Sequence, residues 1–192
     1  IHCKGYLVRD DNMKPLYMIG CVNEIGKRQK ADNVSGLLGE SGFREYMNQL
    51  DTPLETGYLL RIGIDHFKEI NDNFGQEYGD FVLKKTAECI SGCTSEGQKV
   101  YKLVADEFLI LDVASDEAKD ADKLYDKVRE AIDRFIETNE FKVMYTVSGG
   151  IVPFAALKGN QCSEALKLTD FALNEAKKLG RNRCYIFNGE TY

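Results

Sequence analysis

The sequence lacks a long apolar run and a secretory signal. No stretch is long enough to cross a bilayer, and residues Ile1–Gly5 are not a charged cap followed by an apolar segment. We therefore expect a cytoplasmic protein with no membrane insertion in this chain. The first residue is not Met, so we also expect the chain to be part of a longer protein.

Two further features are scarce: positive charge and closely spaced metal ligands. The 25 basic and 31 acidic side chains give a net charge of −6. This balance excludes a general attraction for nucleic acid, although it leaves room for a local basic pocket. The six cysteines form no Cys-x-x-Cys pair and there are only two histidines, which disfavours a zinc knuckle. We interpret the cysteines as reduced thiols.

The 192 residues fit one medium domain with an appendage. Residues 1–31 are predicted to form a β-hairpin and a linker. Its strands are Tyr6–Val8 and Leu16–Ile19, with turn-forming residues at Asp10–Asn12. Residues 32–192 are predicted to form the main domain.

In the main domain, helical and strand-like segments alternate. Two strand-like segments, 100–104 and 108–113, follow each other directly, which predicts a hairpin inside a sheet otherwise joined by crossovers. Another strand is predicted at 142–152. The expected fold class is therefore α+β, with a central mixed sheet of about five strands flanked by helices.

Four polar segments stand out from the apolar pattern: Asp32–Leu38, Asp65–Asp80, Ala105–Glu107, and the group Lys177, Arg181 and Arg183. Polar groups after a buried strand are typical of ligand sites, and adjacent carboxylates can hold Mg²⁺ beside a phosphate. Cations at the end of a helix can bind phosphate. Each segment taken alone is also compatible with ordinary turn chemistry or with a helix dipole.

The order of these segments resembles the GGDEF domain, the family of diguanylate cyclases, over residues from about 32 to 188. The matching segments are Asp32–Leu37, Ile64–Asp80, Val104–Phe108 and Ala176–Asn182. Val104–Phe108 reads Val-Ala-Asp-Glu-Phe where the family signature reads Gly-Gly-Asp-Glu-Phe. In the appendage, Met18–Arg28 is similar to the closing stretch of a PAS domain.

The resemblance implies a palm-like domain that joins two GTP molecules into cyclic dimeric GMP, one GTP being held by each half of a dimer. In that reaction a divalent metal neutralises the charge of the phosphates and orients them. Carried over by motif, the guanine contacts are Asn71 and Asp80, and the triphosphate contacts are Lys68, Lys177 and Arg181. The metal ligands are Asp106 and the backbone of Ile64, and Glu107 is the catalytic acid.

The sequence departs from the family pattern at positions that concern the metal, the turn and the inhibitory site. The family's first metal-binding Asp is Gly63 here, and the two signature glycines are Val104 and Ala105. Glycine in such a turn permits positive φ and close approach of backbone to nucleotide. The Arg and Asp of the family's product-inhibition motif are Ser95 and Gln98.

We therefore expect a degenerate GGDEF domain without cyclase activity, in which Glu107 is vestigial. GTP, with Mg²⁺ when it is bound, is the expected regulatory ligand. The expected partners are a second copy of the chain or neighbouring signalling domains. Two alternatives stay open: an active cyclase with an altered metal site, and a dimerisation scaffold without catalysis.

Overall fold

The computed structural model describes residues 2–10, 14–23, 31–50, 52, 54–115, 118–138, 143–159 and 162–189. The chain divides into two compact units, residues 1–30 and 31–192. The first unit is an antiparallel hairpin of β1 (His2–Arg9) and β2 (Pro15–Asn23), as predicted. Its turn lies mostly outside the described residues, but the Lys14 backbone N–H donates to the Asp10 carboxylate beside it.

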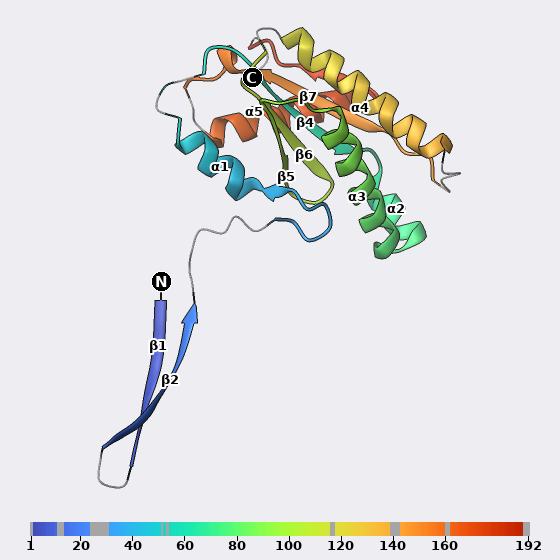
Figure 1. The fold of residues 1–192 in the computed structure, drawn as a ribbon. Helices are drawn as coiled ribbons and strands as arrows, with labels where there is room; N and C mark the ends of the chain where they lie inside the picture. Colours follow the sequence, from blue (N-terminus) through green and yellow to red (C-terminus); the bar gives the residue numbers. More distant parts are fainter. Residues whose placement is uncertain are drawn as a thin grey trace. The chain divides into compact units, whose positions relative to one another are not determined.

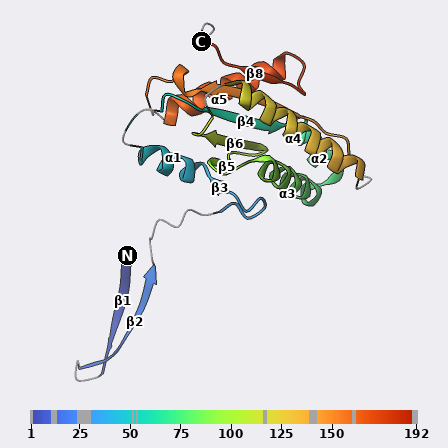
Figure 2. The same cartoon turned by 45° about the horizontal axis from the view of Figure 1, so that its top comes forward.

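The second unit is built on one mixed six-stranded sheet in the order β3-β5-β6-β4-β7-β8 (Figures 1 and 2). The strands are β3 (Leu38–Gly39), β4 (Tyr58–Ile64), β5 (Gln98–Lys102), β6 (Glu107–Asp112), β7 (Val147–Pro153) and β8 (Cys184–Ile186). The helices are α1 (Glu40–Asn48), α2 (Phe67–Phe74), α3 (Gln76–Cys93), α4 (Ala118–Thr138), α5 (Cys162–Lys178) and the 3₁₀ turn η1 (Phe154–Ala156). The predicted fold class is confirmed. The sixth strand is β3, whose two residues are too short to give a sequence pattern.

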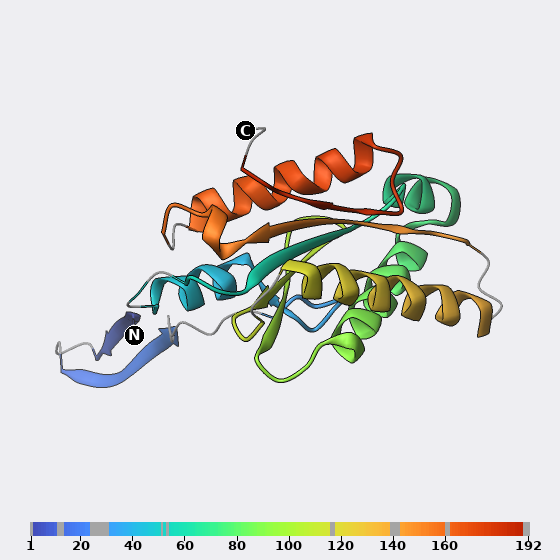
Figure 3. The same cartoon turned by 90° about the horizontal axis from the view of Figure 1, so that it is seen from above.

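Helices cover the sheet on both faces, with α5 on one side and α4 on the other (Figure 3). Tyr58, Leu60 and Ile62 of β4 pack in the core cluster that includes α3 and α4. Leu59 belongs to the cluster that includes α1 and the start of α5. Because side chains alternate along a strand, Arg61 and Gly63 also lie on the α5 face.

Gly150 of β7 brings α5 close to the sheet. A Cβ atom at this position would lie 2.3 Å from the backbone nitrogen of Leu173, a distance that real Cβ atoms do not adopt. The missing side chain lets the helix backbone rest directly on the strand. The C-terminal half of α5, which carries Lys177, is thereby held over β4 and β7.

One predicted strand boundary is wrong. The strand expected at 142–152 begins only at Val147, and the described residues 143–146 are not in a strand. The last ladder pair joins Ile64 to Val147, because β4 ends there. A single further bond, from the Asp65 N–H to the Thr146 carbonyl at 2.8 Å, extends the contact. The β-branched composition of the segment does not reveal where its partner strand stops.

In the part of the chain that the structure describes, no helix has the length and apolar character needed to span a membrane. The four cysteines with described side chains, Cys89, Cys93, Cys162 and Cys184, are free thiols. Burial raises the pKa of Cys89, to about 11, which keeps this thiol protonated at neutral pH.

Candidate functional site

The carboxylate of Asp65 joins three segments at the end of β4. It accepts hydrogen bonds from the hydroxyls of Thr146 and Ser148, both at 2.7 Å, and from the backbone N–H of Asn182 at 3.2 Å. Asp65 is buried. These donors occupy both of its oxygens, so the residue organises the site but offers little to a ligand.

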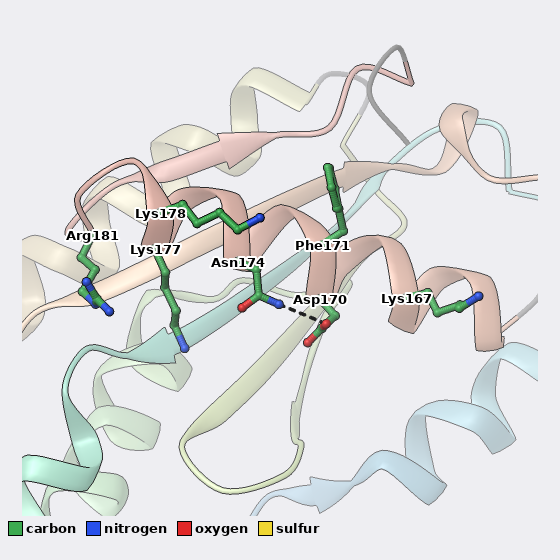
Figure 4. Close-up of a pocket in the computed structure, with 7 residues that line it drawn as sticks. All are labelled: Lys167, Asp170, Phe171, Asn174, Lys177, Lys178 and Arg181. Carbon is green, nitrogen blue, oxygen red and sulfur yellow. Dashed lines mark hydrogen bonds between the residues drawn. The ribbon is translucent and has the colours of Figure 1, made fainter.

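Gly63 lies two residues earlier on the same strand, directly between Glu107 of β6 and Ser148 of β7. A Cβ atom at Gly63 would lie 3.1 Å from the ammonium nitrogen of Lys177 and 3.2 Å from Leu173. The Lys177 side chain extends from α5 toward the end of β4 (Figure 4). An ammonium group therefore stands beside the position from which a metal-binding carboxylate would project.

The predicted hairpin is present as β5 and β6, but its tip is residues 103–106 and not 105–107, because β5 ends at Lys102 and β6 already begins at Glu107. The Glu107 N–H donates to the Val104 carbonyl, and Ala105 adopts φ 53°. This left-handed conformation disfavours a residue with a Cβ. The Val104 side chain is 70 % exposed and stands at the open tip. Val104 and Ala105, which stand in place of the two signature glycines, therefore form a strained turn with an apolar side chain facing outward.

Lys102 lies beneath this tip and stabilises it. Its ammonium donates hydrogen bonds to the carbonyls of Leu103 and Ala105, and it is buried. Burial lowers the pKa of Lys102, while Asp32, Asp106 and Glu107 act in the opposite direction. The first polar segment of the sequence has a related place: Asp32 forms a turn with Ser35 and contributes charge beside Lys102.

Glu107 is neutralised by Arg61. The guanidinium of Arg61 donates through Nε, at 2.8 Å, and through NH2 to the same Glu107 oxygen, Oε2. NH2 also contacts Asp170 at 3.2 Å, and NH1 donates to the Leu166 carbonyl at 3.2 Å. The other Glu107 oxygen lies 3.9 Å from Lys177. Because the Arg61 and Glu107 side chains are only 12 % and 18 % exposed, this pair is only weakly screened by water.

Asp106 is the remaining signature acid. Burial raises its pKa, and the neighbouring carboxylate of Glu107 acts in the same direction, whereas Lys177 and Lys102 oppose the shift. We call Arg61, Gly63, Glu107, Lys177 and the tip 103–106 the hairpin end of the site.

Asn71 and Asp80 lie where α2 and α3 meet, on either side of Gly75, whose φ of 86° makes the corner. A Cβ atom at Gly79 would lie 1.8 Å from the Asn71 side-chain oxygen, so the amide occupies space that only glycine leaves open. That oxygen is buried and has no hydrogen-bond partner. We call Asn71, Gly79 and Asp80 the α2–α3 corner.

A groove of about 750 Å³ runs along α5 (Figure 4). It is lined by Lys167, Asp170, Phe171, Asn174, Lys177, Lys178 and Arg181. Asp170 is its one carboxylate, and it accepts a hydrogen bond from Asn174 and contacts Arg61. Two predicted phosphate contacts, Lys177 and Arg181, thus line one cationic surface. The third, Lys68, is exposed in the first turn of α2 and does not line this groove.

Ser95 and Gln98 bond to each other. The Ser95 N–H donates to the Gln98 side-chain oxygen at 2.8 Å, and the Gln98 amide donates to Asp112 at 2.7 Å. Both residues are therefore engaged in closing the turn before β5. The absence of an inhibitory dinucleotide site at these positions stays a prediction.

The residues at the hairpin end do not fit a divalent metal. Gly63 supplies no carboxylate, the Asp65 oxygens accept three hydrogen bonds, and Glu107 is paired with Arg61. Among the described residues, no three His, Cys, Asp or Glu side chains come together in a way that could hold a metal ion. The role of Asp106 and of the Ile64 backbone as metal ligands stays a prediction.

Arg61 of the hairpin end, and Lys102 beneath its tip, were not predicted from the sequence. Each is a charged residue inside an otherwise apolar strand segment, Tyr58–Ile64 and Val100–Leu103. A buried charge is costly unless it is paired, so this interruption was a usable signal. The role of Gly79 had no such signal, because it depends on where the Asn71 amide lies.

Comparison with known proteins shows similarity to proteins that contain a GGDEF domain. Residues 30–183 match the model of the family described as diguanylate cyclase, GGDEF domain. The chain is 30 % identical over 162 residues to the cyclic di-GMP phosphodiesterase NbdA of Pseudomonas aeruginosa, covering 82 % of this chain and 20 % of NbdA. It is 26 % identical over 189 residues to the diguanylate cyclase VdcA of Vibrio cholerae, covering 95 % and 55 %. The chain therefore spans between a fifth and about half of these relatives.

Solved structures share the fold. The GGDEF domain of TpbB (YfiN) from Pseudomonas aeruginosa superimposes with a TM-score of 0.73 at 24 % identity, covering 83 % of this chain and 95 % of that one. The GGDEF domain of DgcB from Caulobacter crescentus, in complex with c-di-GMP, gives a TM-score of 0.70 at 22 % identity, covering 85 % and 98 %.

Proposed function

Because this chain belongs to the GGDEF family of diguanylate cyclase domains, we propose that it binds GTP at its α2–α3 corner as a regulatory ligand and does not convert it to cyclic dimeric GMP. The domain relays nucleotide occupancy to a partner, which is a second copy of the chain or a neighbouring signalling domain. We place it in the cytoplasm, where GTP is available. The hairpin of residues 1–30 is, in this proposal, the end of a PAS sensor.

The observation that carries the proposal is the buried, unpartnered side-chain oxygen of Asn71 beside Gly79. A buried acceptor without a donor is costly, so the position favours a ligand that brings an N–H group. Asp80, the next residue after Gly79, adds a carboxylate, which only accepts hydrogen bonds when ionised. Guanine presents N–H donors on its Watson–Crick edge at both N1 and N2, whereas adenine offers neither there. Two acceptors at one corner therefore favour guanine.

The hairpin end supports the absence of turnover. Attack of a ribose hydroxyl on a phosphate needs charge neutralisation and a correctly placed acid or base. Glu107 is held by Arg61, and Gly63 offers no carboxylate for metal. Val104 places a β-branched side chain at the tip, where the family has bare backbone. These changes act on the same chemical step, which favours a silent domain over an active cyclase with an altered metal site.

The retained polar groups also favour a binding domain over a pure dimerisation scaffold. A dimerisation scaffold has no need for the unpartnered Asn71 oxygen at the α2–α3 corner. It also has no need for the two cations Lys177 and Arg181 in the α5 groove.

Titration calorimetry with GTP and ATP, together with chromatography of the nucleotide after incubation with Mg²⁺ or Mn²⁺, tests the proposal. We expect saturable GTP binding, weaker ATP binding and no cyclic dinucleotide. The Gly63→Asp, Val104→Gly and Ala105→Gly triple variant is the change expected to favour product, since it restores the metal ligand and opens the tip. Robust product from the unmodified chain would overturn the silent assignment, and a lack of GTP binding would overturn the regulatory role.

A further inference from the structure

The hairpin end carries cationic side chains at the place where the family resemblance implies a divalent ion. We propose that this site binds the triphosphate of its nucleotide in the metal-free form, with Lys177 supplying the positive charge while Arg61 neutralises Glu107. The inference rests on the proposed function, because it concerns how the same nucleotide is held.

Lys177 is the first reason. Its ammonium nitrogen lies 3.1 Å from the position that a Gly63 Cβ would take, and its ε-carbon lies 3.4 Å from it. The lysine therefore fills the space next to β4 into which an aspartate at residue 63 would extend. A lysine ammonium is a compact charge with three donors, well suited to phosphate oxygens. Helix α5 therefore places a cation beside residue 63.

Arg61 is the second reason, because it leaves Lys177 available. Arg61 makes the short contacts to Glu107, whereas Lys177 lies 3.9 Å from that carboxylate. A distance of 3.9 Å is too long for a hydrogen bond, so the Lys177 donors are not committed to Glu107. With Arg61 neutralising Glu107, the signature acid repels an incoming phosphate less than a lone carboxylate would.

The α5 groove extends the same charge. Lys177 and Arg181 line it together, and its one carboxylate, Asp170, is already in contact with Arg61 and Asn174 (Figure 4). A triphosphate entering the groove therefore meets Lys177 and Arg181, while the carboxylate of the groove itself is already paired. Metal-bound GTP carries two fewer negative charges than free GTP, so a site built from fixed cations favours the free form.

The test is titration calorimetry of GTP into the full chain in EDTA and in excess Mg²⁺. We expect the unmodified chain to bind GTP at least as tightly in EDTA as in Mg²⁺. The informative variant is Gly63→Asp, and Gly63→Asn is its uncharged control of equal size. Only flexible side-chain ends of Lys177 and Leu173 need to shift for either. Gly63→Asp should weaken binding in EDTA by about tenfold and make Mg²⁺ favourable, whereas Gly63→Asn should do neither.

A second pair of variants covers the case in which residue 63 tolerates no side chain. Lys177→Gln should weaken GTP binding in EDTA by about tenfold, while Lys84→Gln, at an exposed lysine of α3, should leave it unchanged. GTP binding that appears only with Mg²⁺ would overturn this inference and leave the proposed function standing. An absence of binding in both buffers would overturn both.

Discussion

The α2–α3 corner and the hairpin end lie in one domain but differ in how their polar groups are satisfied. At the corner, the Asn71 oxygen is buried without a partner, in a space that Gly79 leaves open. At the hairpin end, Glu107 is satisfied by Arg61, and directly after β4 the buried Asp65 is satisfied by the hydroxyls of Thr146 and Ser148. Unsatisfied groups are ready for a ligand, whereas satisfied ones resist it. Under the proposed function, this difference separates base recognition at the corner from phosphate binding at the hairpin end.

The strongest way to break this comparison is to remove an acceptor from the corner. Asp80→Ala should weaken GTP binding by about 100-fold, because the corner loses its one charged acceptor for the proposed guanine, and should change ATP binding little. Titration calorimetry measures both. Asp72→Ala, which removes an exposed acid of the neighbouring helix α2, is the matched control and should leave GTP affinity within about twofold. Equal losses for both nucleotides in Asp80→Ala would show that the corner does not read the base.

The hairpin end is tested by breaking its central ion pair. Arg61→Leu should lower the free energy of unfolding by about 2 kcal/mol, because the poorly exposed Glu107 loses the cation that neutralises it. Urea denaturation gives the value. The double variant Arg61→Leu with Glu107→Leu should recover most of it, since no unpaired charge then remains.

The exposed pair of Arg44 and Glu40 provides a control for this experiment. Arg44→Leu should cost no more than about 0.5 kcal/mol, because solvent screens a surface pair. If Arg61→Leu were as mild as Arg44→Leu, the Arg61–Glu107 pair would not be a structural part of the hairpin end.

The smallest expected effect concerns the strained tip. Ala105→Gly should raise the free energy of unfolding by about 1 kcal/mol, because glycine adopts φ near 53° without a Cβ clash. Ala155→Gly, at an exposed position of η1, should act in the opposite direction, by about 0.5 kcal/mol. Thermal denaturation of the two variants gives the comparison. Destabilisation by both would mean that the tip stores no strain.

The fold was largely predictable because long periodic segments dominate it. The predicted alternation of helices and strands is present, and the two consecutive strands predicted at 100–104 and 108–113 appear as the β5–β6 hairpin. The start of β7 was not predictable, because it depends on where β4 ends. The two-residue β3 depends on its pairing with β5 alone.

The residue types of the site could be predicted from the sequence, but the pairing of its charged groups could not. Motif order brought Asn71, Asp106 and Lys177 into consideration, and nothing in their spacing indicated which acids would be neutralised. That depends on Arg61, which is 46 residues from Glu107 in the chain and meets it only across paired strands. Contacts of this kind arise from strand register, which a local pattern does not contain.

The Asp65 carboxylate has a consequence for how the chain folds. Its three donors come from residues 81, 83 and 117 positions later in the sequence. Contacts of such long range close large loops, and loop entropy delays them until much of the chain is already ordered. The loop that follows α5 and carries Arg181 is fastened through Asn182 to this carboxylate, so the cationic groove takes its final form late in folding. The groove thus depends on contacts that join Asp65 to residues as distant as Asn182.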